Sequence, residues 1–261
     1  MNSGLRTALI VCTLGLSAIL TAIPTRLWAA TLSDIRQRGY LIVAVKDNLY
    51  PLGYRDDRGT WQGFEIALAK RLAMDLFGSE QALRLTPVSN VDRLAAVASG
   101  AVDLAIAQVT ITETRMRQVS FSDAYYRNGT GILARNPKWN GLQTLYRQAI
   151  AVLQPSVTLA HLPSRLPLAR LKGVPSYVAA QQLLDSGQVE AIVGDQLVLS
   201  ALARRQPQYF FAPTTLTVQP LGMAMPKGVQ YESLRQWVNH NLRQWQQQGW
   251  LEQQRQVWGL P

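Results

Sequence analysis

Polar residues end two segments of similar pattern, and these positions are the first candidates for chemistry in the sequence. Residues 97–108 read Val-Ala-Ser-Gly-Ala-Val-Asp-Leu-Ala-Ile-Ala-Gln, and residues 184–195 read Leu-Asp-Ser-Gly-Gln-Val-Glu-Ala-Ile-Val-Gly-Asp. In both, a helix end and a Ser-Gly stop precede a short strand that ends on Gln108 or Asp195. Chance similarity is the alternative, since Ser-Gly is a common stop. Because ligands of open α/β sheets lie at the carboxyl ends of strands, we predict that Gln108 and Asp195 occupy opposite walls of a cleft.

Residue types suited to metal or covalent chemistry are scarce. The 261 residues include only 2 His and 1 Cys. A His/Cys metal cluster is therefore not expected, and Cys12 cannot form an intramolecular disulfide. The sequence offers no recognisable nucleophile–base pair, and His161 and His240 fit surface or packing positions. We expect no metal and no cofactor.

Short apolar strands alternate with amphipathic helices, and this alternation predicts an α/β fold. The clearest helix, predicted over residues 64–77, places Phe64, Leu68 and Leu72 on one face. Further strands are predicted at 41–45, 83–88, 102–107, 191–194 and 216–225, and further helices at 91–98, 176–184, 231–248 and 250–258. The two segments of similar pattern indicate two lobes of similar construction that share a cleft.

Charge and the N-terminal segment restrict the partners. The chain carries 26 Lys+Arg against 16 Asp+Glu, a net charge of +10. These basic residues are scattered and not interleaved with aromatic ones, which argues against nucleic acid as a partner.

Residues 1–30 contain Arg6, an uncharged apolar run over 7–23 and small residues at the end, a pattern typical of a secretory signal peptide. The length of the apolar run is close to the minimum for spanning a bilayer, so an uncleaved membrane anchor is the alternative.

Several motifs share a distinctive order. The most specific is Thr110-Ile-Thr-Glu-Thr-Arg115 followed by Val119-Ser-Phe-Ser-Asp-Ala-Tyr125. The supporting segments are Lys46-Asp47, Tyr50-Pro51, Gly63-Phe64-Glu65-Ile66-Ala67-Leu68-Ala69, Ser99-Gly100-Ala-Val-Asp103-Leu, Leu234-Arg, Val238-Asn239, Leu242, Gly249 and Trp258. Over residues 31–260 the chain thereby resembles the polar amino-acid solute-binding proteins of bacterial ABC importers, extracellular solute-binding protein family 3.

The resemblance implies a fold and a domain organisation. Members of that family have a type II periplasmic-binding-protein-like fold, in which two α/β lobes joined by two hinge crossings close on a free amino acid. Lobe 1 would comprise residues 31–128 plus 220–261, and lobe 2 residues 129–219. The crossings would lie near Asn128-Gly129 and Gln219-Pro220.

An α-amino acid presents a carboxylate and an ammonium, and removing both from water is costly unless each meets an opposite charge. The resemblance assigns the carboxylate to Arg115, whose guanidinium can form a bidentate pair, and to the hydroxyl or N–H of Thr110. It assigns the ammonium to Asp195. The structural alternatives are a surface position for Arg115, a helix cap or plain strand end at Thr110, and an Asp195 that caps the helix starting near Gln196.

Three further positions are assigned to the ligand through the resemblance. The carbonyl near Gln108 would be a second ammonium partner, and the Gln108 side chain would line the cleft. Asp47 and Tyr50 would contact the ligand's side chain. Alternatively, Asp47 caps a turn and Tyr50 packs under the lobe. An acid at position 47 favours a polar or basic amino acid.

One segment departs from the family pattern. Where the family has a Gly-Ser/Thr-Thr loop that opens a helix beside the carboxylate, this chain has Pro155, Ser156 and Val157. Pro155 has no N–H and Val157 has no hydroxyl, so only Ser156 can contribute its side chain. We therefore predict a carboxylate held more by Arg115 and less by lobe 2, or a ligand in a shifted position.

The resemblance predicts a periplasmic receptor that delivers a free amino acid to an ABC permease in the inner membrane, acting as a monomer and without enzymatic activity. Two other classes stay open. One is an enzyme on the same scaffold, of the dehydratase or murein-cleaving type, which would need a cleft carboxylic acid such as Asp47 or Glu65. The other is a ligand-sensing domain that works with a membrane partner and is held by residues 7–23.

Overall fold

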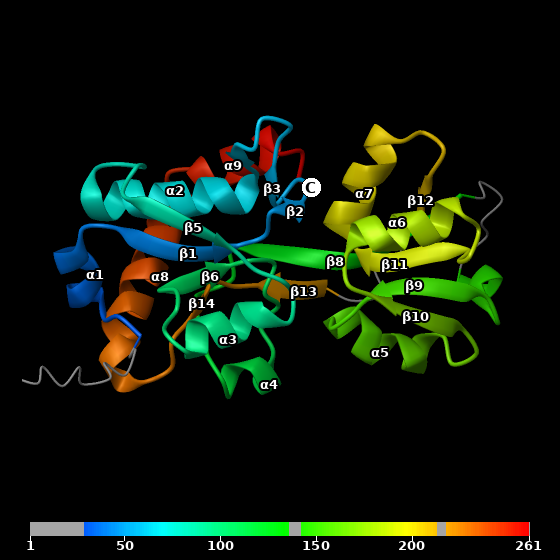
Figure 1. Cartoon of the computed structure of the whole chain (residues 1–261), viewed down its shortest axis with the longest axis horizontal. Helices are drawn as coiled ribbons and strands as arrows, with labels where there is room; N and C mark the ends of the chain where they lie inside the picture. The colour runs from blue at the N-terminus through cyan, green and yellow to red at the C-terminus, as the bar shows by residue number, and fades with distance from the viewer. Residues whose placement is uncertain (1–28, 136–141, 213–217, 261) are drawn as a thin grey trace, which may run out of the picture.

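Strands rich in Val, Ile, Leu and Ala form the centres of two separate sheets in the computed structural model, which describes residues 29–135, 142–212 and 218–260. Each sheet lies at the centre of one lobe, and the two lobes lie side by side (Figure 1). The predicted signal or anchor segment, including Cys12, falls outside these residues except for positions 29–30. Within the described ranges, every helix is too short or too polar to span a bilayer.

The first lobe is built on the sheet β5-β1-β6-β14-β7. Strand β1 is parallel to both β5 and β6, whereas β14 is antiparallel to β6 and β7. The strands are β1 (Leu41–Val45), β5 (Leu83–Pro87), β6 (Leu104–Ile106), β7 (Ser120–Phe121) and β14 (Ala224–Met225). A small antiparallel sheet follows β1 and consists of β2 (Asn48–Leu49), β3 (Gly53–Arg55) and β4 (Trp61–Gln62).

Helices cover both faces of the first sheet (Figure 1). They are α1 (Leu32–Arg38), α2 (Phe64–Phe77), α3 (Asp92–Ala98), α4 (Glu113–Met116), α8 (Glu232–Gln247) and α9 (Trp250–Val257), with a 3₁₀ turn at Val229–Tyr231. The apolar face predicted for α2 is buried, because Phe64, Leu68 and Leu72 are inaccessible to solvent. Gly78 adopts a left-handed conformation with φ 71° and ends α2, as its position predicts.

The second lobe contains the sheet β10-β9-β11-β8-β12. Its strands are β8 (Tyr126–Ala134), β9 (Ala149–Leu153), β10 (Arg170–Val174), β11 (Ala191–Asp195) and β12 (Phe210–Ala212). Its helices are α5 (Val157–Arg165), α6 (Tyr177–Asp185) and α7 (Gln196–Arg205), with a 3₁₀ turn at Leu142–Leu145. The strand predicted over 191–194 and the helix predicted over 176–184 are confirmed to within one residue.

Strands β8 and β13 (Val218–Leu221) run between the lobes (Figure 1). The first residues of β8 pair antiparallel with β13, and its later residues pair with β11 and β12. In this register Asn128 lies opposite Gln219, and Thr130 lies opposite Asp195. Strand β8 therefore extends from its pairing with β13, between the lobes, to its pairing with β11, the strand that ends at Asp195.

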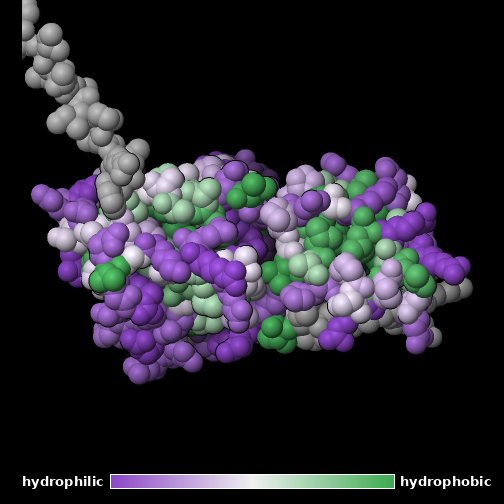
Figure 2. Space-filling view, turned by 90° about the horizontal axis from the view of Figure 1, so that it is seen from below, coloured by the Kyte–Doolittle hydropathy of each residue, from purple (hydrophilic) through white to green (hydrophobic). Residues whose placement is uncertain are grey.

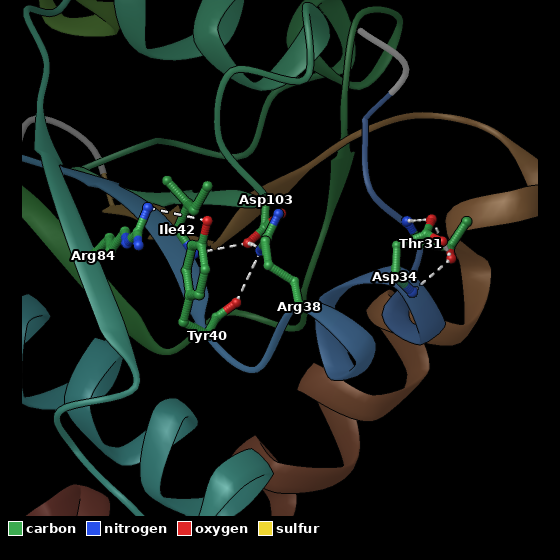
Figure 3. A network of polar contacts seen from close by, with 7 residues as sticks. All are labelled: Thr31, Asp34, Arg38, Tyr40, Ile42, Arg84 and Asp103. Atoms are coloured by element: carbon green, nitrogen blue, oxygen red, sulfur yellow. Dashed lines mark hydrogen bonds and ion pairs between the residues drawn. The ribbon is translucent and has the colours of Figure 1, made fainter.

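A polar network fastens the N-terminal helix to the first sheet (Figure 3). Thr31 and Asp34 form a capping box at the start of α1. At its other end, the Arg38 guanidinium forms an ion pair with the Asp103 carboxylate, which also accepts the Ile42 N–H at 2.7 Å. The Tyr40 ring is covered by the guanidinium of Arg84, 3.7 Å from its centroid.

The Asp103→Ala variant is expected to unfold at a clearly lower temperature than the wild type. Its carboxylate is almost completely buried, so its loss leaves a guanidinium and an N–H without their acceptor. We expect a stability loss of about 2–4 kcal/mol, measured by thermal unfolding. Asp57→Ala, in an exposed turn, serves as the control and should change stability by less than about 0.5 kcal/mol. Equal melting temperatures for Asp103→Ala and wild type would contradict the assigned role.

Candidate ligand-binding site

Gln108 and Asp195 meet where the two lobes face each other. Gln108 follows β6 in the first lobe, and Asp195 ends β11 in the second. The Gln108 Nε2 donates to the Asp195 Oδ2 at 2.6 Å. Two segments with similar sequence patterns therefore deliver their last polar residues to opposite walls of one site, as predicted.

Asp195 is held by several donors and does not cap the helix that follows it. Its carboxylate accepts hydrogen bonds from Asn128 Nδ2 at 2.6 Å and from the Tyr177 hydroxyl at 2.9 Å. Although Asp195 occupies the N-cap position of α7, its side chain makes no capping bond. Burial raises the pKa of Asp195 above its ordinary value, and the bonds from Tyr177 and Asn128 and the charge of Arg93 oppose that rise. The carboxylate is thus fixed in place as an acceptor that faces the other lobe.

Arg115 comes from the short helix α4, whose start is capped by Thr112. Its Nη1 donates to the Thr110 carbonyl oxygen at 2.9 Å, and the Thr110 hydroxyl donates to Gln219 Oε1 at 3.3 Å. Burial lowers the pKa of Arg115 while the charge of Asp195 opposes this. Arg115 is therefore a half-buried cation on the wall opposite Asp195.

A small cavity between the lobes gathers five of the seven predicted site residues. Its volume is about 20 Å³, which leaves room for about one water molecule, so a larger ligand requires the two walls to separate. The lining residues are Asn90, Arg93, Gln108, Thr110, Arg115, Leu153, Pro155, Ser156, Val157, Thr158, Asp195 and Gln219. Figure 2 shows a hollow between the lobes on the face that carries α3, α4 and α5.

Ser156 caps helix α5 and also lines this cavity. Its Oγ accepts the Leu159 N–H at 3.1 Å and so caps α5, which starts at Val157. The hydroxyl hydrogen is still available as a donor to a ligand. Pro155 precedes the cap and causes no loss of helical hydrogen bonds. Of residues 155–157, only Ser156 thus offers a hydroxyl to the cavity, and Thr158 of α5 adds a second hydroxyl to the same lining.

Tyr50 and Asp47 lie outside this cavity. The backbone carbonyl of Asp47 accepts the Arg55 N–H at 2.9 Å, which ties that segment to the β2–β3 hairpin. The Tyr50 ring packs edge-on against Tyr54 and beneath the Arg205 guanidinium, 4.7 Å from its centroid. Tyr50 instead lines a second cavity of about 330 Å³, shared with residues of α6 and α7. Asp47 lines neither cavity.

The sequence analysis gave no ligand-site role to four residues that shape the site, although it named Glu65 as a possible cleft acid of an enzyme and Asn128 as a crossing position. Asn128 and Tyr177 hold Asp195, and Arg93 lines the cavity. Glu65 is fully buried behind it, where its Oε1 accepts the Tyr125 hydroxyl at 2.5 Å and the Gln108 N–H at 2.8 Å. Tyr177 follows the helix-capping Ser176. That serine could have indicated the start of a helix at Tyr177, but it gives no indication that Tyr177 contacts Asp195.

Glu65 stabilises an unusual backbone conformation. Gln108 has φ 55°, in the left-handed region that costs a non-glycine residue roughly 1–2 kcal/mol. The Glu65 carboxylate fixes the Gln108 N–H, and Arg93 Nη1 fixes the Gln108 carbonyl at 2.9 Å. Burial raises the pKa of Glu65. Two buried charged side chains therefore hold the turn that directs Gln108 toward Asp195.

Comparison with known proteins agrees with this architecture. Residues 41–261 match the bacterial extracellular solute-binding proteins, family 3. The chain is 30% identical over 200 residues to the glutamine-binding protein of Geobacillus stearothermophilus, covering 76% of each protein. It is also 26% identical over 255 residues to the cyclohexadienyl dehydratase of Pseudomonas aeruginosa, covering 92% of this chain and 90% of that protein.

Solved structures show the same two-lobed fold. The crystal structure of the solute receptors for L-cysteine of Neisseria gonorrhoeae superimposes with a TM-score of 0.81 at 27% identity, covering 87% of this chain and 93% of that one. Two α/β lobes with a polar site between them define a periplasmic-binding-protein-like receptor of type II. The chain belongs to the bacterial extracellular solute-binding proteins, family 3.

Proposed function

We propose that the protein captures a free amino acid between its lobes and delivers it to an ABC permease of the inner membrane. The observation that carries this proposal is the placement of Arg115 and Asp195 on opposite walls of one cavity. A cation and an anion that face one cavity from opposite walls match the opposite charges of the carboxylate and ammonium of an α-amino acid. Because the ligand then bridges the lobes, it stabilises their closed arrangement, which is the form that a permease can recognise.

Neutral groups complete this binding site. Ser156 and Thr110 offer hydroxyl groups to the cavity that Arg115 lines. Gln108 offers a side-chain amide, which donates to Asp195 Oδ2. The ligand ammonium replaces the Gln108 amide on Asp195 when it binds. Relatives with names such as glutamine-binding protein and L-cystine-binding protein support an amino acid as the ligand class.

The lobe boundaries belong to the same proposal. We place lobe 1 at residues 31–128 plus 220–261 and lobe 2 at 129–219. The pairing of Asn128 with Gln219 on β8 and β13 supports crossings at these positions. Residues 1–30 are assigned to export, with the mature chain in the periplasm. The protein is proposed to act as a monomer.

Binding without turnover is favoured over catalysis. The dehydratase relative gives the enzyme hypothesis some weight. A raised-pKa carboxyl group is present in Glu65, but it does not line the cavity and its Oε1 is committed to Tyr125 and Gln108. Asp195 also has a raised pKa and lines the cavity, but its carboxylate is held by Asn128 and Tyr177 as an acceptor, which suits an ammonium.

Isothermal titration against the twenty amino acids plus ornithine and citrulline tests the proposal. Saturable binding of at least one amino acid, with the ligand recovered unchanged, is the expected result. A folded protein that binds none of them would contradict it. Conversion of an added ligand to product would favour the enzyme hypothesis.

A further inference from the structure

A second arginine faces the proposed ligand. Arg93, in α3, is 4% exposed and lines the same cavity as Arg115 and Asp195. Its Nη1 donates to the carbonyl oxygens of Ala107 at 2.6 Å and Gln108 at 2.9 Å. Its Nε is buried and has no hydrogen-bond partner among the described residues. This guanidinium is therefore incompletely satisfied.

The charges around the cavity do not balance. Its described lining contains two guanidinium groups, Arg93 and Arg115, against the single carboxylate of Asp195. Among the described residues, no acidic side chain forms an ion pair with either arginine. Glu65 is the other buried acid nearby, but its Oε1 accepts from Tyr125 and Gln108 and it stays outside the cavity. The lining thus carries one cation in excess.

Arg93 stays charged despite this environment. Burial, followed by the neighbouring charge of Arg115, lowers the pKa of Arg93 to about 10. That value is still far above neutral pH, so the guanidinium is protonated when ligand binds. The charges of Glu65 and Asp195 oppose this lowering without cancelling it. A buried cation without a direct ion pair is costly, and an anion brought by the ligand would reduce that cost.

A neutral amino acid leaves the excess cation in place, since its carboxylate and ammonium use Arg115 and Asp195. A basic side chain would add a further positive charge. We propose that the ligand is an acidic amino acid whose side-chain carboxylate binds Arg93, while its α-carboxylate binds Arg115 and its ammonium binds Asp195. Asn90, which also lines the cavity, supplies an additional amide to the side chain. This inference rests on the proposed function and specifies its ligand.

Titration of the full chain with glutamate, aspartate, glutamine, asparagine and arginine is the test. Glutamate or aspartate is expected to bind roughly 100-fold more tightly than its amide, because only the acid pairs with Arg93. The Arg93→Met variant should bind acid and amide with similar affinity, mainly through weaker binding of the acid. Arg93→Lys retains the charge and should retain the preference for the acid. Arg58→Met, in an exposed turn, is the matched control.

Each contrary result has a distinct meaning. Tighter binding of an amide or of arginine by the wild type overturns the acidic ligand but leaves the proposed function intact. An equal loss of acid and amide binding in Arg93→Met would mean that Arg93 acts through the α-carboxylate or through the Gln108 turn that it holds, and would also overturn the proposal. Absence of any amino-acid binding by the folded wild type contradicts the proposed function itself. The wild-type comparison needs no variant, so a misfolded variant would not prevent a decision.

Discussion

The Arg115→Ala variant is expected to lower amino-acid affinity by about 1000-fold. Its guanidinium is the half-buried cation opposite Asp195, and without it the ligand carboxylate is removed from water with no bidentate partner on that wall. Truncating one side of a desolvated charge pair costs 2–5 kcal/mol or more, and about 4 kcal/mol corresponds to a factor of 1000. Isothermal titration with the best ligand of the wild type measures the change.

Arg117→Ala is the matched control for this prediction. Arg117 is the C-cap residue of the same short helix, is exposed and lies outside the cavity. It should bind ligand as the wild type does, whereas Arg115→Ala should not. Comparable affinities for the two variants would contradict the assignment of Arg115. Thermal unfolding of both variants separates a lost ligand contact from a lost fold, since Arg115 also donates to Thr110.

Asp195→Asn is also expected to have a large effect, a loss of at least about 100-fold. Asparagine preserves the volume of the side chain, and its single oxygen can still accept the bond from either Asn128 or Tyr177. It removes the negative charge that the ammonium requires, and the ammonium would then be buried without a counter-ion. Asp185→Asn, at the end of α6 and outside both cavities, is the control. Retention of wild-type affinity by Asp195→Asn would contradict the ammonium assignment.

The same carboxylate predicts a pH dependence of binding. Burial raises the pKa of Asp195 above the ordinary value of 3.8. A protonated Asp195 cannot hold an ammonium, so affinity should be full well above the raised pKa and should fall as the pH decreases through it. The decrease should therefore begin at a higher pH than for an ordinary aspartate. Glu65→Gln, which removes the other buried carboxyl, should leave this dependence in place. A flat affinity across that range would argue against Asp195.

Local patterns predicted most of the fold. The helix over 64–77 and the strand over 41–45 have the predicted bounds because each pattern is decided within the element, by apolar spacing and by Gly78. The extended segment predicted over 216–225 is two strands in the described part, β13 and β14. They belong to different sheets, and sheet membership depends on partners far away in sequence.

Local patterns located candidate site residues only at the ends of strands, whereas Arg115, within α4, was assigned through the family resemblance. Gln108 and Asp195 could be located because each follows a strand. Arg93 gave no such signal, since an arginine within a helix normally faces solvent and its burial here depends on carbonyls of another segment. The position of Tyr50 depends on Tyr54 and on Arg205 of the other lobe, so the sequence could not indicate which cavity it lines, and its contact with a ligand stays a prediction.

The strand β8 connects the two lobes and also supplies Asn128, which donates to Asp195. A substitution at position 128 would therefore alter both the flexibility of the connection between the lobes and the basicity of the Asp195 carboxylate. Evolution can thus adjust the affinity of such a receptor without replacing Arg115 or Asp195. A designer of amino-acid sensors could use position 128 to match affinity to the concentration being measured.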